Sequence, residues 1–268
     1  MNFRVDVMIV GDSKSGHDIL DKLAASNSAL NIAFISQSFK STTAHDYMNV
    51  RYVKDEVEYI SYRHRLFCCY MKNGDNIFST HLVVASGLDY EPFMLNNEQV
   101  PCVFNTVDDV TKLAKDQPAL VICNNDADAK FAMEVAKKYK QVYLCTKAVD
   151  LTESISNTTA KKLAKVENIV VMPNTSIQKV TVDNGVLQKV TFDNYSEVSC
   201  SAIYVKTASK PAIEFIPRKI LAREEEYPVV NDSCESTLVP GCFAAGNCLS
   251  KYTKAMEQKL IDAILKDF

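Results

Sequence analysis

The 268-residue sequence has no tryptophan and only seven glycines. Loops that bind nucleotides use glycine to bring the backbone against phosphate, and two such loops usually need about seven glycines between them. The chain therefore has few glycines to spare for nucleotide loops. It also lacks any run of about 18 apolar residues, the length of a membrane span, and any secretory signal pattern. We expect a cytoplasmic protein with no membrane partner.

The sequence also lacks the motifs of common catalytic and metal sites. None of the nine cysteines lies in a C-x-x-C pair, and zinc-ligand spacings are absent, so we expect no metal site. Cys123, Cys145 and Cys200 lie in apolar runs typical of strands, where a reduced cysteine acts as a small hydrophobic residue. No Ser-His-Asp spacing or H-E-x-x-H motif indicates a hydrolase, and no catalytic residue is assigned.

Charge is nearly balanced along the chain. The net charge is −3, and the lysines and arginines are scattered rather than interleaved with aromatic residues in one block. Such a distribution does not match a nucleic-acid backbone, so we expect no nucleic-acid partner. The hydrophobic content of 47% is that of a folded chain with one large core or two smaller ones.

The N-terminal segment has the pattern of a strand-helix-strand unit. Residues 5–10, VDVMIV, form an apolar run of strand length, and a helical pattern follows the loop at 11–16. Residues 30–36, LNIAFIS, form a second strand. This order predicts a parallel sheet with a right-handed crossover.

The same pattern begins again in the middle of the chain. The segment ALVIC (119–123) is strand-like, an amphipathic helix follows it, and QVYLCT (141–146) is a second strand. Further on, Asn184-Gly185 separates two alternating runs, which is a strong hairpin signal. Two strand-helix-strand units in one chain predict two α/β domains.

Five segments, taken in order, resemble the thioredoxin reductase and pyridine nucleotide-disulfide oxidoreductase family of two-domain flavoproteins. VDVMIVGDSKSG resembles the FAD-binding loop, and LVVASGLDYEP resembles the Ala-Thr-Gly segment of the FAD domain. ALVICNNDADA resembles the NAD(P)H loop, and TASKP resembles the segment where the chain returns from the second domain to the first. VPGCFAAGNC resembles the segment that touches the flavin ribityl chain. The resemblance covers nearly the whole chain. It identifies the protein as a shortened, degenerate member of this family.

This resemblance implies an α/β fold with two Rossmann-like dinucleotide-binding domains, the second inserted in the first. The expected domains are a discontinuous FAD-type domain, 1–112 plus 212–268, and an NAD(P)H-type domain, 113–211. Family members favour a homodimer. The apolar stripe of the C-terminal helix, Leu260, Ile261 and Ile264, fits packing either on its own domain or across such a dimer.

The FAD-type site departs mildly from the family pattern. Where the family has G-x-G-x-x-G, this chain has Gly11-x-Ser13-x-x-Gly16. In one alternative, the Asp12 carboxylate repels a phosphate and weakens its binding, and the positive charge of Lys14 offsets much of this cost. In the other, Asp12 or Ser13 caps the helix and takes the place of the phosphate. The resemblance assigns cofactor contacts to Gly11, Ser13, Lys14, Gly16, Ser36, Ala85, Ser86, Gly87, Gly246 and Asn247.

Two of these residues replace acidic family residues. Ser36 or Gln37 stands where the family holds the adenosine ribose with a carboxylate, and Asn247 stands in place of an aspartate. Both replacements still offer polar atoms for hydrogen bonding. FAD therefore remains a candidate cofactor. His17, in the first helical turn, is expected to face solvent.

The NAD(P)H loop departs further. Cys123, Asn125 and Asp128 occupy the small positions of the family, and Asp126 lies beside them. A pyrophosphate would meet two carboxylates at a helix start that these carboxylates themselves stabilise. The basic residues that read a 2′-phosphate are reduced to Lys147. We expect that NAD(P)H does not bind and that the aspartates cap their own helix.

Two functions follow from these departures. Disulfide reduction needs a C-x-x-C or C-x4-C pair beside the flavin, and the chain has neither. The first hypothesis is a non-disulfide-reducing binding or regulatory module with at most residual FAD-type nucleotide binding. The alternative is a reduced FAD-dependent oxidoreductase that uses an unusual electron donor. The sequence leaves open whether the protein is an enzyme.

Overall fold

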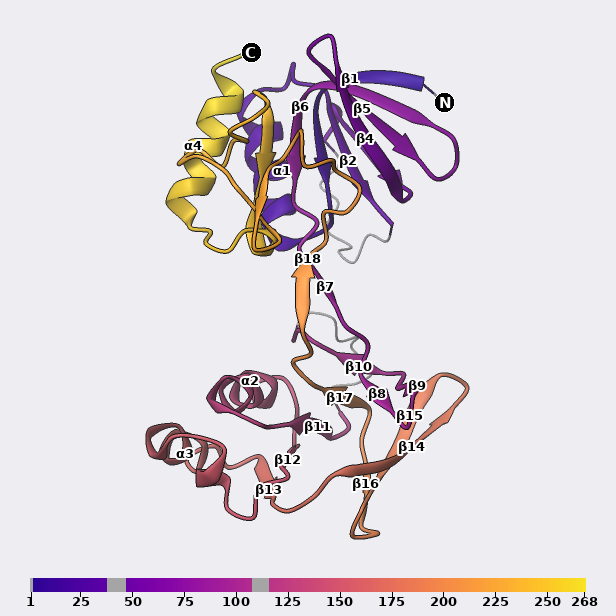
Figure 1. Cartoon of the computed structure of the whole chain (residues 1–268), viewed down its shortest axis with the longest axis vertical. Helices are drawn as coiled ribbons and strands as arrows, with labels where there is room; N and C mark the ends of the chain where they lie inside the picture. Colours follow the sequence, from indigo (N-terminus) through magenta and orange to yellow (C-terminus); the bar gives the residue numbers. More distant parts are fainter. Residues whose placement is uncertain (1, 38–46, 108–115) are drawn as a thin grey trace. The chain divides into compact units, whose positions relative to one another are not determined.

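Two units make up the chain in the computed structural model, which describes residues 2–37, 47–107 and 116–268 (Figure 1). The first unit comprises Met1–Asp89 and Ser209–Phe268, and the second comprises Tyr90–Ala208. At the two crossings, strands β7 (Leu88–Tyr90) and β18 (Ser209–Pro211) pair with each other. A smaller second unit is thus inserted in a discontinuous first unit.

The crossings differ in position from the expected domain ends. The expected end at 112/113 lies outside the described residues, and the structure divides the chain already after Asp89. The reason is that the chain beyond Tyr90 pairs within the second unit, where β10 (Val103–Phe104) lies parallel to β17 (Ala202–Tyr204). The second division follows Ala208, three residues before the expected end.

The first unit contains a seven-stranded sheet with the order β3-β2-β1-β6-β5-β4, in which β6 also pairs with β21. Strands β1, β2, β3, β6 and β21 run parallel, whereas β4 and β5 form an antiparallel extension. The bounds are β1 Asn2–Val10, β2 Ile32–Ser36, β3 Val50–Lys54, β4 Val57–Arg63, β5 Leu66–Met71, β6 Asn76–Val84 and β21 Cys242–Ala244. Two short strands of the unit, β19 (Arg223–Glu224) and β20 (Tyr227–Pro228), pair antiparallel as a hairpin.

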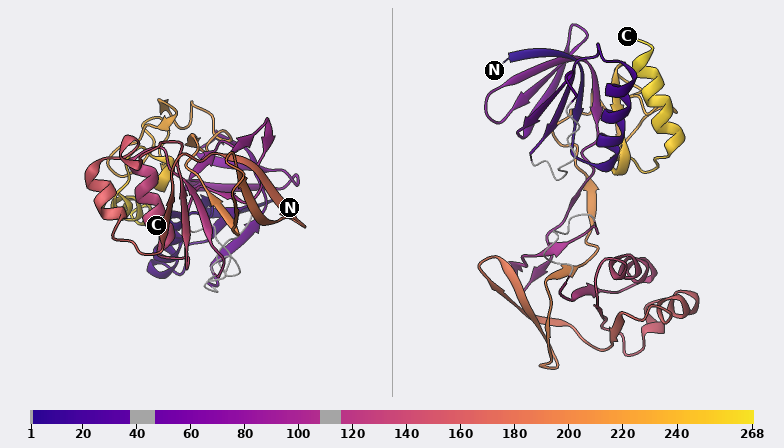
Figure 2. Two further views of the ribbon diagram at one scale, coloured as in Figure 1. Left: turned by 90° about the horizontal axis from the view of Figure 1, so that it is seen from below. Right: turned by 180° about the vertical axis from the view of Figure 1, so that it is seen from behind.

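Helix α1 (Lys14–Ser26) connects β1 to the parallel strand β2, which confirms the predicted N-terminal unit. Helix α4 (Lys254–Leu265) packs beside α1 (Figure 2). The apolar stripe of α4 is buried in the core of this unit: Leu260, Ile261 and Ile264 are at most 2% exposed. The apolar stripe therefore packs against the core of its own domain.

The second unit contains a five-stranded parallel sheet with the order β10-β17-β11-β12-β13. Helices α2 and α3 lie on one side of this sheet, and the antiparallel strands β14, β15 and β16 lie on the other (Figure 1). The bounds are β8 Met94–Leu95, β9 Glu98–Gln99, β11 Ala119–Ile122, α2 Asp126–Ala136, β12 Val142–Cys145, α3 Asn157–Leu163, β13 Ile169–Met172, β14 Ile177–Asp183, β15 Val186–Phe192 and β16 Glu197–Ser199.

The predicted hairpin is confirmed between β14 and β15. Asp183 pairs with Val186 across the turn, and the turn residues Asn184 and Gly185 have φ values of 49° and 78°. Positive φ at both central positions is the geometry that Asn-Gly favours. Within the described ranges, no helix has both the length and the apolar character needed to cross a bilayer.

Candidate nucleotide-binding sites

The loop between β1 and α1 keeps a tight strand-to-helix turn. Gly11 has a φ of +113°, and a Cβ added there would lie 2.4 Å from the carbonyl oxygen of Ala85. A Cβ added at Gly16 would lie 2.6 Å from the carbonyl oxygen of Gly11. Close backbone packing therefore requires both glycines, whether or not a phosphate binds beside them.

Ser13 caps the helix that follows this turn. It is the N-cap residue of α1, and its Oγ accepts a hydrogen bond from the backbone N–H of Gly16 at 3.2 Å. The free N–H groups at a helix start are the donors that bind phosphate. A phosphate that used the Gly16 N–H would have to displace the Ser13 hydroxyl.

The side chain of Asp12 pairs with His17. The Asp12 carboxylate bonds to Nε2 of His17, and the side chains of Asp12 and His17 are 5% and 21% exposed. The His17 ring also packs against Phe34, with ring centroids 4.9 Å apart. The expectation that His17 faces solvent is therefore wrong, because Asp12 and Phe34 hold its ring half-buried. Asp12 thus pairs with this ring. Lys14, which was expected to offset the Asp12 charge beside a phosphate, is exposed and forms no ion pair within the described chain.

Several other expected contacts meet around the start of α1. Ala85 follows β6 and donates its N–H to the carbonyl of Val10 at 2.8 Å. Gly246 has a φ of +76°, and a Cβ there would lie 2.8 Å from the Oγ of Ser15. The Oγ of Ser86 is buried and has no hydrogen-bond partner among the residues placed by the structure. These residues join Gly11, Ser13 and Gly16 in one cluster at the carboxyl ends of the parallel strands.

The remaining expected contacts lie toward the edge of this cluster or outside it. Ser36 ends β2, and its carbonyl accepts the N–H of Asp55 at 2.9 Å. Gly87 has a φ of +76° and open space around its Cα, and its carbonyl accepts the N–H of Ala212 at 3.1 Å. Asn247 is exposed in the 3-10 turn Gly246–Cys248.

In the second unit, side chains of the loop itself occupy the start of α2. Asn125 is the N-cap residue, and its Oδ1 accepts hydrogen bonds from the N–H groups of Ala127 at 2.8 Å and Asp128 at 3.1 Å. The buried carboxylate of Asp128 accepts the N–H of Asn124 at 2.9 Å. Three backbone donors that face a phosphate in a nucleotide loop are thus bonded internally.

Asp126 has a different role from the one expected. Its carboxylate accepts the backbone N–H of Ser156 at 2.7 Å, just before α3 begins. Hydrogen bonds from Ser156 lower the pKa of Asp126, so this carboxylate is ionised at neutral pH. The expectation that both aspartates cap their own helix is therefore wrong for Asp126, which ties α2 to α3. The role of Asn125 as the N-cap was missed, although the sequence contains a signal for it: an asparagine just before an amphipathic helix is a preferred N-cap.

The other residues of the NAD(P)H-type site offer no positive charge at the loop. Cys123 is buried, and burial with the nearby Asp128 carboxylate raises the pKa of its thiol to about 11. Lys147 is exposed beyond the end of β12. The loop therefore carries carboxylates and no lysine or arginine at the position where a pyrophosphate would sit.

None of the nine cysteines forms a disulfide, and eight of them are buried. Burial raises the pKa of Cys69, Cys200 and Cys248 to about 12, which keeps these thiols protonated. Only Cys102 is partly exposed. In the part of the chain that is described, no group of His, Cys, Asp and Glu side chains is arranged to hold a metal ion.

Residues 35–246 match the family model described as pyridine nucleotide-disulphide oxidoreductase. The fold is similar to thioredoxin reductase from Lactococcus lactis, with 15% identity, 98% coverage of each chain and a TM-score of 0.65. It is also similar to thioredoxin reductase from T. acidophilum, with 15% identity, 98% coverage of each chain and a TM-score of 0.66. Thioredoxin reductase from Streptococcus pyogenes is similar as well, with 15% identity, 100% coverage of each chain and a TM-score of 0.64. No curated protein matches the chain by sequence. The predicted α/β fold with FAD/NAD(P)-binding architecture is confirmed.

Proposed function

We propose that this chain, which belongs to the pyridine nucleotide-disulphide oxidoreductase family and has a thioredoxin reductase-like fold, is a binding or regulatory module. It does not reduce disulfides with NAD(P)H. At most, it retains residual FAD-type nucleotide binding. One observation carries the proposal: the side chains of Asn125 and Asp128 already occupy the backbone donors at the start of α2.

Electrostatics at this helix start support the proposal. A carboxylate about 5 Å from a phosphate costs on the order of 3 kcal/mol at an effective dielectric constant near 20. Asp126 and Asp128 would both contribute to this cost, and displacing the Asn125 cap would cost about 1 kcal/mol more. The favourable helix dipole, about 0.3–1 kcal/mol, is too small to compensate.

The cysteines support the second part of the proposal. The family's route to a disulfide substrate requires a pair of cysteines that alternate between dithiol and disulfide. The sequence contains no C-x-x-C or C-x4-C pair, and eight of its cysteines are buried with no disulfide. Electrons from a flavin would have no such pair through which to leave.

Titration with NADH and with NADPH, followed by calorimetry, tests the NAD(P)H part directly. We expect no saturable binding of either nucleotide up to about 1 mM, which corresponds to a binding free energy weaker than about −4 kcal/mol. Submillimolar affinity for either nucleotide would show that the capped start of α2 does not prevent binding. Because the titration needs no catalytic activity, its result does not depend on whether FAD is present.

A second candidate function is an FAD-dependent oxidoreductase with an unusual electron donor. The observation that favours it is the buried, unpartnered Oγ of Ser86, a residue whose Cα lies beside Gly11. A bound group that hydrogen-bonds this hydroxyl would satisfy it. FAD would be held by Gly11, Ser13, Gly16, Ser86 and Asn247, and would supply two-electron redox chemistry when bound.

The absorption spectrum of the purified protein separates the two candidates. We expect no stoichiometric flavin. If the purified protein carried one FAD per chain, the second candidate would replace the first. In that case Ser86→Ala would weaken FAD retention, while Ser61→Ala, a matched change on the antiparallel strand β4, would leave it unchanged.

A further inference from the structure

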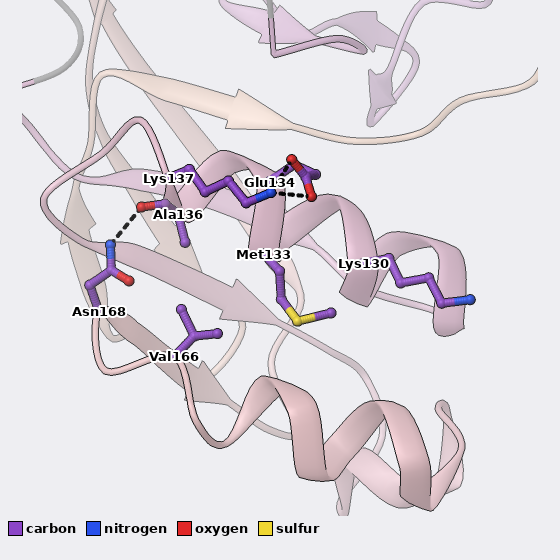
Figure 3. Close-up of a pocket in the computed structure, with 7 residues that line it drawn as sticks. All are labelled: Lys130, Met133, Glu134, Ala136, Lys137, Val166 and Asn168. Atoms are coloured by element: carbon purple, nitrogen blue, oxygen red, sulfur yellow. Dashed lines mark hydrogen bonds and ion pairs between the residues drawn. The ribbon is translucent and has the colours of Figure 1, made fainter.

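A groove of about 630 Å³ lies along the outer face of α2 (Figure 3). One wall is a single helical stripe: Lys130, Met133, Glu134 and Lys137 recur at the i, i+3, i+4 and i+7 spacing that places residues on one face of a helix. The groove is separate from the nucleotide-type loop, which lies at the opposite, N-terminal end of α2.

The second wall follows α3 and is fixed to α2 by side-chain hydrogen bonds. Val166 and Asn168 form this wall. The Nδ2 of Asn168 donates to the carbonyl oxygens of Ala136 at 2.8 Å and Tyr139 at 2.9 Å. These bonds satisfy carbonyls at the end of α2 and hold the two walls together, so the groove is formed before any ligand binds.

The groove combines an apolar floor with a cationic rim. Met133, Ala136 and Val166 supply apolar surface. The acidic side chain in the lining, Glu134, is paired with Lys137 at 2.7 Å. Lys130 forms no ion pair with the other lining residues, and its charge is offset in part by Asp126, one turn earlier on α2. Lys165 is exposed directly before Val166 on the opposite wall.

This rim belongs to a wider basic face. The stretches 130–140 and 161–168 together contain seven exposed lysines and two glutamates, Glu134 and Glu167. One of the lysines, Lys140, pairs with Asp116 at 3.0 Å, so an excess of positive charge remains along the two stretches. The chain as a whole has a net charge of −3, so the positive charge is concentrated at this groove rather than general. A local excess of one sign attracts partners of the opposite charge.

We propose that this groove binds an acidic, amphipathic segment of a partner protein. Apolar side chains of the segment would pack on Met133 and Val166, and its carboxylates would meet Lys130 and Lys165. The groove lining contains no aromatic side chain on which a nucleic-acid base could stack, and it is concave, which disfavours a flat membrane surface. An amphipathic helix in an apolar groove is a common mode of peptide recognition.

The test uses a labelled synthetic peptide of about 16 residues, with leucines on one helical face and glutamates elsewhere. We expect saturable binding to the full-length protein that weakens as salt is added. The double variant Lys130→Glu with Lys165→Glu should bind the peptide about tenfold more weakly. The control Lys147→Glu with Lys179→Glu, which changes net charge equally on exposed sites away from the groove, should bind as the wild type does.

Met133→Glu gives an independent readout, because it places a repelling charge on the apolar floor without removing a lysine. We expect it to abolish binding while the circular dichroism spectrum stays that of the wild type. Three results would overturn the proposal: no peptide binding, equal binding by the groove variant and its control, or binding of single-stranded RNA or anionic vesicles at this groove in place of the peptide.

Discussion

The Nζ of Lys22 lies 2.8 Å from a carboxylate oxygen of Glu257, and this pair joins the first helix of the chain to the last. Glu257 is fully buried, whereas Lys22 is 43% exposed. Lys254 bonds to the same carboxylate at 3.1 Å, and the hydroxyl of Tyr252 donates to it at 3.2 Å. Burial raises the pKa of Glu257, but the bonds from the two lysines outweigh burial, and the pKa is lowered overall.

The first prediction concerns the stability of the α1–α4 contact. Glu257→Gln should lower the free energy of unfolding by about 1–3 kcal/mol, because it removes the charge that bonds to Lys22 and Lys254. Urea unfolding measures this difference. The control is Glu134→Gln, which breaks an exposed pair with Lys137 and should change stability by less than about 0.5 kcal/mol.

The same variant has a predicted pH dependence. A lowered pKa in the folded state means that the ionised Glu257 stabilises the protein above the ordinary glutamate pKa, and that this stabilisation is lost as the pH falls through the folded-state value. The difference between wild type and Glu257→Gln should therefore be constant near neutral pH and shrink below about pH 4. A difference that grew on acidification would contradict the lowered pKa.

The second prediction concerns the turn after β1. Gly11→Ala should destabilise the protein by about 2 kcal/mol or more, because the new Cβ would overlap the Ala85 carbonyl at a positive φ. Gly74→Ala is the control: its φ is +86°, but nothing lies within 4 Å of the added Cβ, so only the backbone strain of about 1 kcal/mol should appear. Thermal unfolding without added FAD measures both. Equal costs would mean that the turn can relax.

The third prediction concerns the cap of α2. Asn125→Ala removes the acceptor for two backbone N–H groups and should cost about 1 kcal/mol of stability in the second unit. Hydrogen exchange of the amides in the first turn of α2 should accelerate accordingly. Asn157→Ala, at an exposed position in the first turn of α3, is the matched control and should leave the exchange of α2 unchanged. Unchanged exchange in Asn125→Ala would indicate that another group caps the helix.

The fourth prediction concerns thiol reactivity. In the native protein one cysteine, Cys102, should react with a maleimide or aromatic disulfide reagent, while the eight buried thiols should react only on unfolding. Mass spectrometry of the labelled protein identifies the site, and Cys102→Ser should remove the fast phase. Rapid labelling of two thiols that an oxidant converts to one disulfide would reveal a redox pair and contradict the proposed function.

Local patterns in the sequence were sufficient for much of the fold. The strand, tight loop and helix around Gly11 follow from an apolar run, a glycine at a positive φ and a helical stripe, all within about twenty residues. The Asn184-Gly185 hairpin follows from the φ preferences of two adjacent residues. Such features form where the sequence predicts them because their causes lie in neighbouring residues.

The candidate sites were predicted less completely. The sequence placed Ser13 and the acidic residues at two helix starts, but it did not determine their partners. Asp12 bonds to His17 because the His17 ring packs on Phe34 of β2, and Asp126 bonds to Ser156 because α3 begins beside α2. These partners depend on which side chains the packed helices bring within reach.

By itself, the sequence determined the two α/β units, the hairpin between β14 and β15, and the absence of a C-x-x-C pair. Only the tertiary structure decided that the chain crosses between its units after Asp89, and that Lys22 and Glu257 bond although 235 positions separate them. The physical reason is that periodicity and turn propensity act between neighbours, whereas ion pairs and domain limits arise from side chains that meet only once the core has formed.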